Sequence, residues 1–371
     1  MDPKLKPDWE NTKKRYSDWW EGRLEGPLVQ ISAWREGAEA APPPKWLVKP
    51  EAGWWLMDWM TNQYGNRQRF DEMFDVMESR HAGTRYIGDA LPMLWFNMGP
   101  GVLAAYLSGF LKFVGDTTWF ELPRPMDWND IMKLSLDCRG DWWAKTKETA
   151  RAVVRRAKGR YVIGMTDIGG TLDVVASLRT GEQLLADCVE EPERVVEAVW
   201  HCNKYWKQVF DELTALFDAE GNEGYGAWMG IWSDKPWYPL QSDFSAMLSP
   251  KMAAKYVIPD LQDLCDHIPR TVYHWDGPGE IPLLDQFLAL RNLRGLQWVP
   301  GAAEAQNEAP KWFPLYERIK KGGKACVLQS IPIGKVAEVL KAIGPRDVLV
   351  STWGREEEAL KLAREFGLSE G

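Results

Sequence analysis

The sequence predicts an α/β protein built as a (β/α)8 barrel, with an N-terminal helical lead-in over residues 1–60 and the barrel over residues 61–371. Short apolar segments alternate along the chain with segments of helical periodicity, as in parallel strands joined by helices. These apolar segments lack strict polar–apolar alternation, which is expected of strands buried on both faces. Polar and glycine-rich residues follow their ends, where a barrel forms its site. They include Asp167, Trp232, His274, Pro300–Gly301 and Ser351.

The first half of the chain contains the lead-in and the first barrel elements. A helix ends near Trp20, and the apolar run 27–33 follows as a strand. The proline run within 40–44 interrupts the next segment, because proline cannot continue a helix or a central strand. The other predicted elements of this half are a helix over 67–82, a short apolar segment after the turn 99–101, an extended segment over 117–122, a helix over 139–157 and a strand over 161–165.

The second half repeats the strand–helix alternation more regularly. The acidic run 190–194 opens a helix to about 217, since negative charge is favoured at a helix N-terminus. Ser249 and Pro250 form a good N-cap and first-turn pair for another. The predicted strands cover 225–231, 271–275, 295–300, 325–328 and 347–351, and the predicted helices cover 249–265, 281–290, 309–321, 335–342 and 355–366.

Composition excludes several classes of protein. The 371 residues are 45% hydrophobic and 26% charged, which is ordinary for a globular protein. The net charge of −8 disfavours nucleic acid and acidic membranes as partners. No stretch has the length and apolarity of a signal or membrane-spanning segment, so we expect a cytoplasmic protein. The cysteines are scattered and odd in number, which indicates reduced thiols: Cys138, Cys188, Cys202, Cys265 and Cys326.

Tryptophan is the outlier in composition, with 22 residues. Several occur in clusters, among them Trp54, Trp55 and Trp59. Such side chains either fill a core or wall a pocket for a flat or methylated cationic ligand. Trp228, Trp232 and Trp237 lie in a passage rich in glycine and proline, where a core position is less expected. The predicted substrate contacts are Trp228, Trp232, Gln241, Tyr273 and Trp298.

The run 271–280 carries the best candidate site. His274 and Asp276 are two residues apart on a predicted strand, so both side chains point to the same face. Glu280 follows a Gly-Pro-Gly turn. Imidazole and carboxylates can hold a divalent metal or share a proton, so His274, Asp276 and Glu280 are candidate ligands. The alternative is a histidine that only closes a barrel strand.

Two further carboxylates follow strand ends. Asp167 and Asp243 are candidate acid–base or ligand residues beside a catalytic His274. Gln241 and Asp243 could instead only cap the following helix, and Asp173 reads as structural. No Gly-x-Gly-x-x-Gly or Walker-type fingerprint follows a strand, so nucleotide binding has no support.

Three motifs resemble the uroporphyrinogen decarboxylase superfamily over roughly residues 60–365. They are the run 241–250, the run 167–173 with Arg179 and Glu182, and Tyr273-His-Trp-Asp-Gly-Pro278. This resemblance implies a (β/α)8 barrel. It also implies either a decarboxylase or a zinc-dependent methyltransferase that moves methyl groups to or from cobalamin carriers or thiols.

Departures from the family pattern favour the methyltransferase branch. The arginine-rich motif of the decarboxylases is missing, whereas the histidine of the methyltransferase His-x-Cys pair is present as His274. Asp276 stands in place of the cysteine, and Ser351–Gly354 occupies the second cysteine region. The resemblance thus implies zinc held by nitrogen and oxygen ligands, and transfer from a methoxyaromatic or methylamine donor to cobalamin on a partner protein. A decarboxylase and a non-catalytic corrinoid or small-molecule binding barrel remain the alternatives.

Overall fold

The computed structural model describes residues 1–39, 41–42, 67–114, 117–301 and 303–371. Trp54, Trp55 and Trp59, most of the proline run and the start of the predicted barrel domain lie outside these ranges. Among the described residues, no helix has the length and apolar character needed to cross a bilayer.

The strands form two larger sheets and a hairpin. The first sheet has the order β2-β1-β13-β12-β11-β10-β9, and every pair in it is parallel except β1 with β2. The second has the order β3-β6-β7-β8, with β3, β6 and β7 parallel. The strands are β1 (Leu28–Trp34), β2 (Thr84–Gly88), β3 (Met93–Trp95), β4 (Lys112–Val114), β5 (Thr117–Trp119), β6 (Val162–Gly164), β7 (Tyr225–Gly226), β8 (Trp232–Ser233), β9 (Trp237–Leu240), β10 (Arg270–Asp276), β11 (Leu293–Val299), β12 (Ala325–Leu328) and β13 (Val348–Arg355).

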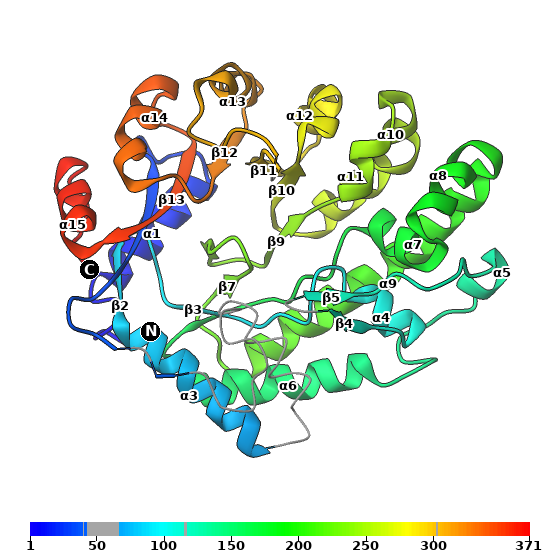
Figure 1. The fold of residues 1–371 in the computed structure, drawn as a ribbon, viewed down its shortest axis with the longest axis horizontal. Coiled ribbons are helices and arrows are strands. Elements are labelled where there is room, and N and C mark those ends of the chain that lie inside the picture. The colour runs from blue at the N-terminus through cyan, green and yellow to red at the C-terminus, as the bar shows by residue number, and fades with distance from the viewer. Residues whose placement is uncertain (40, 43–66, 115–116, 302) are drawn as a thin grey trace.

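Helices surround these strands. In Figure 1, α10 to α15 follow one another in chain order along the upper rim, with β9 to β13 inside them. This arrangement confirms the α/β class. The helices are α1 (Trp9–Trp20), α3 (Arg67–Gly83), α4 (Leu103–Ser108), α5 (Trp128–Ile131), α6 (Trp142–Ala157), α7 (Thr171–Arg179), α8 (Gly181–Glu190), α9 (Pro192–Ala219), α10 (Pro250–Tyr256), α11 (Ile258–His267), α12 (Leu284–Ala289), α13 (Phe313–Lys321), α14 (Val336–Ile343) and α15 (Glu356–Glu365). Short 3₁₀ turns are η1 (Asp243–Met247), η2 (Pro278–Leu283), η3 (Pro310–Trp312) and η4 (Ile333–Lys335).

The sequence locates β10, β11 and β12 to within two residues, ends β13 four residues too early and misses β8 and β9. The predicted strand 225–231 is wrong beyond Gly226, because the chain turns at Gly230, whose φ is 69°. Trp232 and Trp237 are buried in the core rather than in an open loop. Their indoles pack against Trp9 and Trp20 of α1, so the lead-in helix provides apolar partners that local sequence does not reveal.

Two apolar cores lie on opposite faces of the strands. The larger one fills the space between strands and helices. The smaller one contains Leu28, Val272 and Leu349 from three strands, together with Trp19 and Trp20 of α1. On each of these strands, the side chain two positions after Leu28, Val272 or Leu349 points to the same face as the smaller core. Those positions carry polar residues, namely Gln30, His274 and Ser351.

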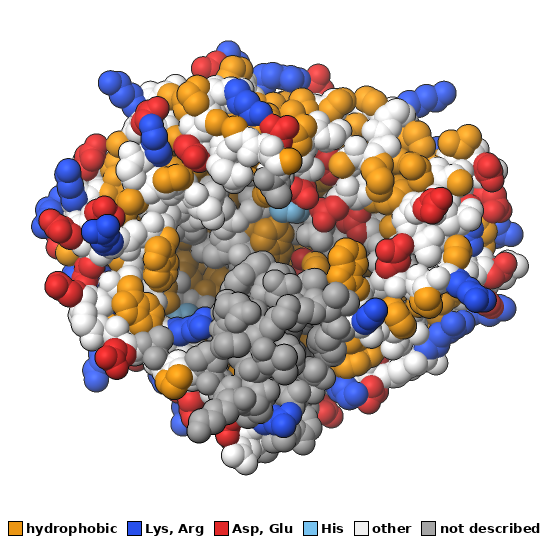
Figure 2. All heavy atoms as spheres, in the orientation of Figure 1, with side chains coloured by type: hydrophobic (Ala, Val, Ile, Leu, Met, Phe, Trp, Pro, Cys, Tyr) orange, Lys and Arg blue, Asp and Glu red, His pale blue; other side chains and the backbone are white. Residues whose placement is uncertain are grey.

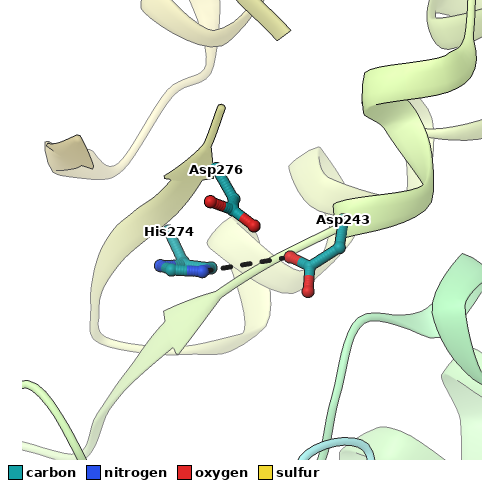
Figure 3. Close-up of side chains that lie close together, drawn as sticks. All are labelled: Asp243, His274 and Asp276. Carbon is teal, nitrogen blue, oxygen red and sulfur yellow. Dashed lines mark ion pairs between the residues drawn. The ribbon is translucent and has the colours of Figure 1, made fainter. Parts of the chain in front are cut away.

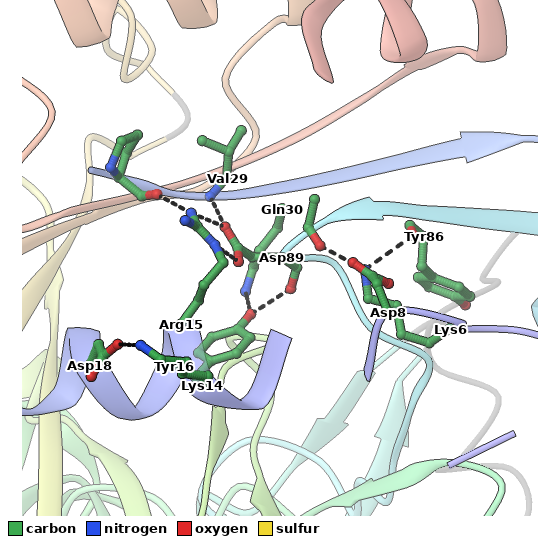
Figure 4. A network of polar contacts seen from close by, with 12 residues as sticks. Lys6, Asp8, Lys14, Arg15, Tyr16, Asp18, Val29, Gln30, Tyr86 and Asp89 are labelled. Carbon is green, nitrogen blue, oxygen red and sulfur yellow. Dashed lines mark hydrogen bonds and ion pairs between the residues drawn. The ribbon is translucent and has the colours of Figure 1, made fainter. Parts of the chain in front are cut away.

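The lead-in helix α1 is attached to the strands by a buried ion pair. Arg15 Nε lies 2.7 Å from Asp89 Oδ1, and the Asp89 side chain is fully buried (Figure 4). Asp89 Oδ2 also accepts a 2.8 Å hydrogen bond from the Val29 amide, and Tyr16 donates to the Asp89 carbonyl. The carboxylate therefore joins α1 to β1 and to the end of β2.

We expect Arg15→Ala to lower the free energy of unfolding by about 3–5 kcal/mol, because it leaves a buried carboxylate without its cation. Arg23→Ala is the matched control. Its guanidinium lies 3.2 Å from Asp18 but is 62% exposed, and we expect a loss of less than about 1 kcal/mol. Urea denaturation of both variants measures the difference, and equal losses would contradict the assigned role of Arg15.

Candidate metal site at the carboxyl ends of the strands

Asp243, His274 and Asp276 form a compact group of potential metal ligands. One ligand atom from each lies within 4.8 Å of the other two. His274 Nε2 and Asp243 Oδ1 are 4.0 Å apart, too far for a direct hydrogen bond but suited to sharing an ion (Figure 3). In Figure 3 the imidazole and both carboxylates point toward a common centre.

Local structure explains how each ligand is placed. His274 and Asp276 share a face of β10, and Gly277, with φ 81°, ends the strand directly after them. Asp243 opens η1, three residues after the end of β9, and β9 pairs in parallel with β10. The carboxyl ends of neighbouring parallel strands meet at the same edge, so the ligands converge there.

A buried aspartate fixes the backbone that carries Asp243. Asp173 accepts hydrogen bonds from the amides of Asp243 at 3.1 Å and Phe244 at 2.8 Å. Gly170 allows this approach, because a Cβ there would lie 2.3 Å from both the Asp173 carboxylate and the Gln241 carbonyl oxygen. Asp173 thus has the structural role that the sequence favours, and it serves the site.

The imidazole is oriented by a chain of amides that begins at a main-chain carbonyl. Gln329 Nε2 donates to the Met229 carbonyl at 3.0 Å, which turns Gln329 Oε1 toward Gln297. That oxygen can only accept, so Gln297 Nε2 donates to it and Gln297 Oε1 faces His274. His274 Nδ1 lies 2.6 Å from Gln297 Oε1 and must donate the proton. In neutral His274 the lone pair is therefore on Nε2, the nitrogen nearer to Asp243.

Negative charge gathers around this histidine. Loss of hydration in the recess, followed by the negative charges of Asp276 and Asp167, raises the pKa of Asp243 to about 7. This shift occurs although 53% of the Asp243 side chain is exposed. Burial raises the pKa of Asp173 to about 7 and that of Asp167 to about 6. Nearby positive charge on His274 opposes the shift at Asp167. A cation at the cluster would oppose these shifts and favour the ionised carboxylates.

Trp228 and Asp167 lie near the group. The Trp228 ring packs edge-on against the His274 ring, with centroids 4.8 Å apart. Asp167 is buried and accepts a hydrogen bond from the Gly169 amide at 2.9 Å. The Tyr238 hydroxyl lies 3.4 Å from the same oxygen. Asp167 therefore influences the site through its charge rather than as a member of the ligand group.

Glu280 lies apart from the ligand group. It is fully buried and accepts hydrogen bonds from the hydroxyls of Ser245 at 2.6 Å and Tyr273 at 3.3 Å. Burial raises its pKa well above the ordinary value, which favours the neutral acid. The expectation that Glu280 joins His274 and Asp276 as a ligand does not fit this placement, because the turn after β10 directs it inward.

Three predicted substrate contacts also point elsewhere. Tyr273 is adjacent to His274 on β10, and Trp298 is adjacent to Gln297 on β11. Because side chains alternate along a strand, Tyr273 and Trp298 point to the opposite face. There Trp298 packs between Trp275 and Trp312.

Trp232 belongs to the smaller core, and its indole N–H donates to the Glu223 carbonyl at 2.9 Å. Gln241 is buried directly after β9, with its carbonyl close to Gly170.

The sequence interpretation overlooked Gln297 and Gln329. A polar residue between Leu296 and Trp298 in an apolar strand is a usable signal, and so is a glutamine directly after the strand 325–328. Their importance depends on register, however. Gln297 pairs with His274 across parallel strands β10 and β11, and no local pattern reveals that pairing.

Two cavities border this region. One, of about 330 Å³, is lined by Asp243 together with Trp119 and Phe120. The other, of about 380 Å³, lies by the ends of β1 and β13, and its lining includes Gly230. Figure 2 shows that this face of the molecule is hollowed near its centre. The ligand group thus adjoins a space large enough for a small molecule.

The donor set fits a divalent cation but not a thiolate zinc site. One imidazole nitrogen and two carboxylates suit zinc or another borderline or hard divalent ion. Four of the five cysteines are buried elsewhere and Cys138 is exposed away from the group, so a thiolate ligand is not provided.

Comparison with known proteins adds no relative. No protein-family model matches the chain, and no curated protein sequence matches it.

We expect Gln329→Leu to weaken Zn²⁺ binding by about 10–100-fold, as is typical when the support of a histidine ligand is removed. The change breaks the bond to Met229 and frees Gln297 to rotate, so Nδ1 of His274 is no longer held as the donor. Gln208→Leu is the control, because Gln208 is an exposed residue of α9 whose side-chain amide donates a hydrogen bond to Glu212. Isothermal titration with Zn²⁺ gives both affinities, and an unchanged value for Gln329→Leu would refute the relay.

Proposed function

We propose that this chain is a (β/α)8-barrel enzyme that moves a methyl group from a small O- or N-methylated donor to a corrinoid carrier protein. The observation that carries this proposal is the group of Asp243, His274 and Asp276 at the strand ends. The resemblance of the run 273–278 to the methyltransferase branch supplies the reaction class.

The barrel is supported by the strand pairing. β13, the last strand, pairs in parallel with β1, so the first sheet joins the two ends of the chain. β7 of the second sheet packs against β9 of the first. A closed barrel would then use β13, β12, β11, β10, β9 with β7, β6 and β3 in succession, with the antiparallel pair of β1 and β2 between β3 and β13.

The metal would be held by Asp243, His274 and Asp276. A divalent cation there supplies a Lewis acid that weakens the bond between the methyl group and its oxygen or nitrogen. The reduced corrinoid of a partner protein would supply the nucleophile. When the methyl group departs, the heteroatom keeps the bonding pair and takes up a proton.

The chain's own residues have separate tasks. Gln297 and Gln329 hold the proton of neutral His274 on Nδ1, and Trp228 packs edge-on against the imidazole ring. Asp167 is buried beside the ligand group, and its carboxylate is suited to accept a proton there. Asp243 lines the adjoining cavity, where Trp119 and Phe120 offer a flat apolar surface to the donor.

The decarboxylase alternative is less well supported. Substrates with several carboxylates need cationic side chains, whereas Asp167, Asp173, Asp243 and Asp276 surround the described site and would repel them. A binding barrel without catalysis is the outcome to separate by experiment.

Metal analysis of protein purified without chelators tests the proposal. We expect near-stoichiometric divalent metal in the wild type and in His267→Ala, whose histidine pairs with Asp211 away from the site. His274→Ala should lose the metal and at least about 100-fold in methyl transfer from methoxyaromatic or methylamine donors.

Two results would contradict the proposal. Metal that persists in His274→Ala would place the ion elsewhere. Bound metal and corrinoid protein without turnover of any donor would favour a binding barrel instead.

A further inference from the structure

The cavity of about 380 Å³ has a wall made by the paired strands β1 and β13. Parallel register places Gln30 beside Ser351 and Ser32 beside Trp353. Within each strand these residues are two positions apart, so all four side chains share one face. The opposite face carries Ile31, which belongs to the larger core. The four residues therefore form a continuous patch on the cavity side of β1 and β13.

Exposure increases along this patch from its floor to its mouth. Gln30 is 7% exposed and lies deepest, whereas Trp353 at the strand ends is 57% exposed. A large aromatic side chain left in solvent at the mouth of a cavity offers a flat face to a ring-shaped ligand. The volume of this cavity, about 380 Å³, is within the usual range of about 300–1,000 Å³ for small-molecule sites.

Polar groups of the patch retain hydrogen-bonding capacity. The Gln30 amide nitrogen donates to the Tyr16 hydroxyl and to the Gly230 carbonyl, both at 2.8 Å. Its Oε1 accepts no hydrogen bond from the described residues. Ser351 Oγ accepts from the Ser330 amide at 3.1 Å, which leaves the Ser351 hydroxyl proton free to donate. One acceptor and one donor thus face the cavity side by side.

The backbone at Ser330 is constrained to make this contact. Ser330 has φ 59°, a left-handed conformation that is unfavourable for a serine. The amide of Ser330 is thereby directed at the Ser351 hydroxyl. Such a conformation is kept where the surrounding structure requires it, often at ligand-binding places.

Charge distinguishes this cavity from the ligand group. No described residue in its lining is charged, although 26% of the chain is Asp, Glu, Lys or Arg. Burying an unpaired charge in such a place is costly, so the lining selects against ions of either sign.

We infer that this cavity binds an uncharged ring carrying hydroxyl or amide groups, which stacks on Trp353 and bonds Gln30 and Ser351. The described lining of this cavity contains none of Asp243, His274 and Asp276, so the inferred site is additional to the metal group. Trp228 packs on His274, whereas Gly230 lines the cavity. The inference goes beyond the proposed methyl transfer and does not depend on it.

Matched probes test the inference. Benzamide and benzoate have nearly the same shape but differ by one charge, as do benzyl alcohol and benzylammonium. In ligand-detected NMR titrations of chelator-treated protein, we expect each neutral probe to bind at least about tenfold more tightly than its ion. Chelation keeps the result independent of metal binding, so failure of the proposed function would leave it unchanged.

Two tryptophan variants locate the binding. Trp353→Ala should weaken benzamide binding at least about fivefold, because it removes the stacking surface. Trp200→Ala is the control, since Trp200 on α9 is 42% exposed and is not among the described residues that line either cavity. Ser32→Lys should reverse the preference, so that benzoate binds more tightly than benzamide. Circular dichroism checks that each variant is folded.

Any of three results would overturn the inference. They are no binding of either neutral probe, equal affinity for a neutral probe and its ion, or a benzamide affinity in Trp353→Ala that is no lower than in Trp200→Ala.

Discussion

Parallel strand register is the constraint on which the rest of the site depends. Because neighbours across β10 and β11 match His274 with Gln297, an imidazole and the amide that orients it reach the same face. The same rule applied to β1 and β13 matches Gln30 with Ser351. A shift of one residue would send each of these polar groups into the helix-facing core, at a cost in buried, unpaired hydrogen-bonding groups. The apolar residues Leu28, Val272 and Leu349 favour the observed register. They lie two positions before Gln30, His274 and Ser351, so the register that buries these apolar side chains also places the polar ones on the same face.

Electrostatics then limits what the polar end of the strands can bind. Several carboxylates lie around one imidazole, and burial raises the pKa values of Asp167 and Asp173. Charged carboxylates held this close in a recess repel one another and lose hydration. Protons or a cation can relieve that repulsion. The relay from the Met229 carbonyl favours a cation, because it holds the proton of neutral His274 on Nδ1 and leaves Nε2 free to coordinate.

The sequence predicts the parts of this arrangement that depend on local pattern. Alternation on one strand is enough to place His274 and Asp276 together, and the strand-end position of Asp243 indicates that it faces the same edge. Asp243, His274 and Asp276 are the residues that the structure groups. Pairing between distant segments is beyond such reasoning. Gln297, Gln329 and the patch on β1 and β13 depend on inter-strand register, and the burial of Trp232 depends on contact with Trp9 in α1. Glu280 was misplaced because the backbone path after Gly277 turns its carboxyl toward Ser245.

The two binding places share one support, and this explains why a neutral ligand suits the second. Adjacent carbonyls of Met229 and Gly230 are held by Gln329 and Gln30, which belong to the histidine relay and to the cavity patch respectively. The places are therefore only a few residues apart, so a charge bound in one acts on charges in the other. A cationic occupant of the cavity would oppose metal binding at Asp243, His274 and Asp276, whereas an anion would add to the repulsion among the carboxylates. An uncharged ring would disturb neither, so the proposed ligand and a metal at the proposed site would be compatible with each other.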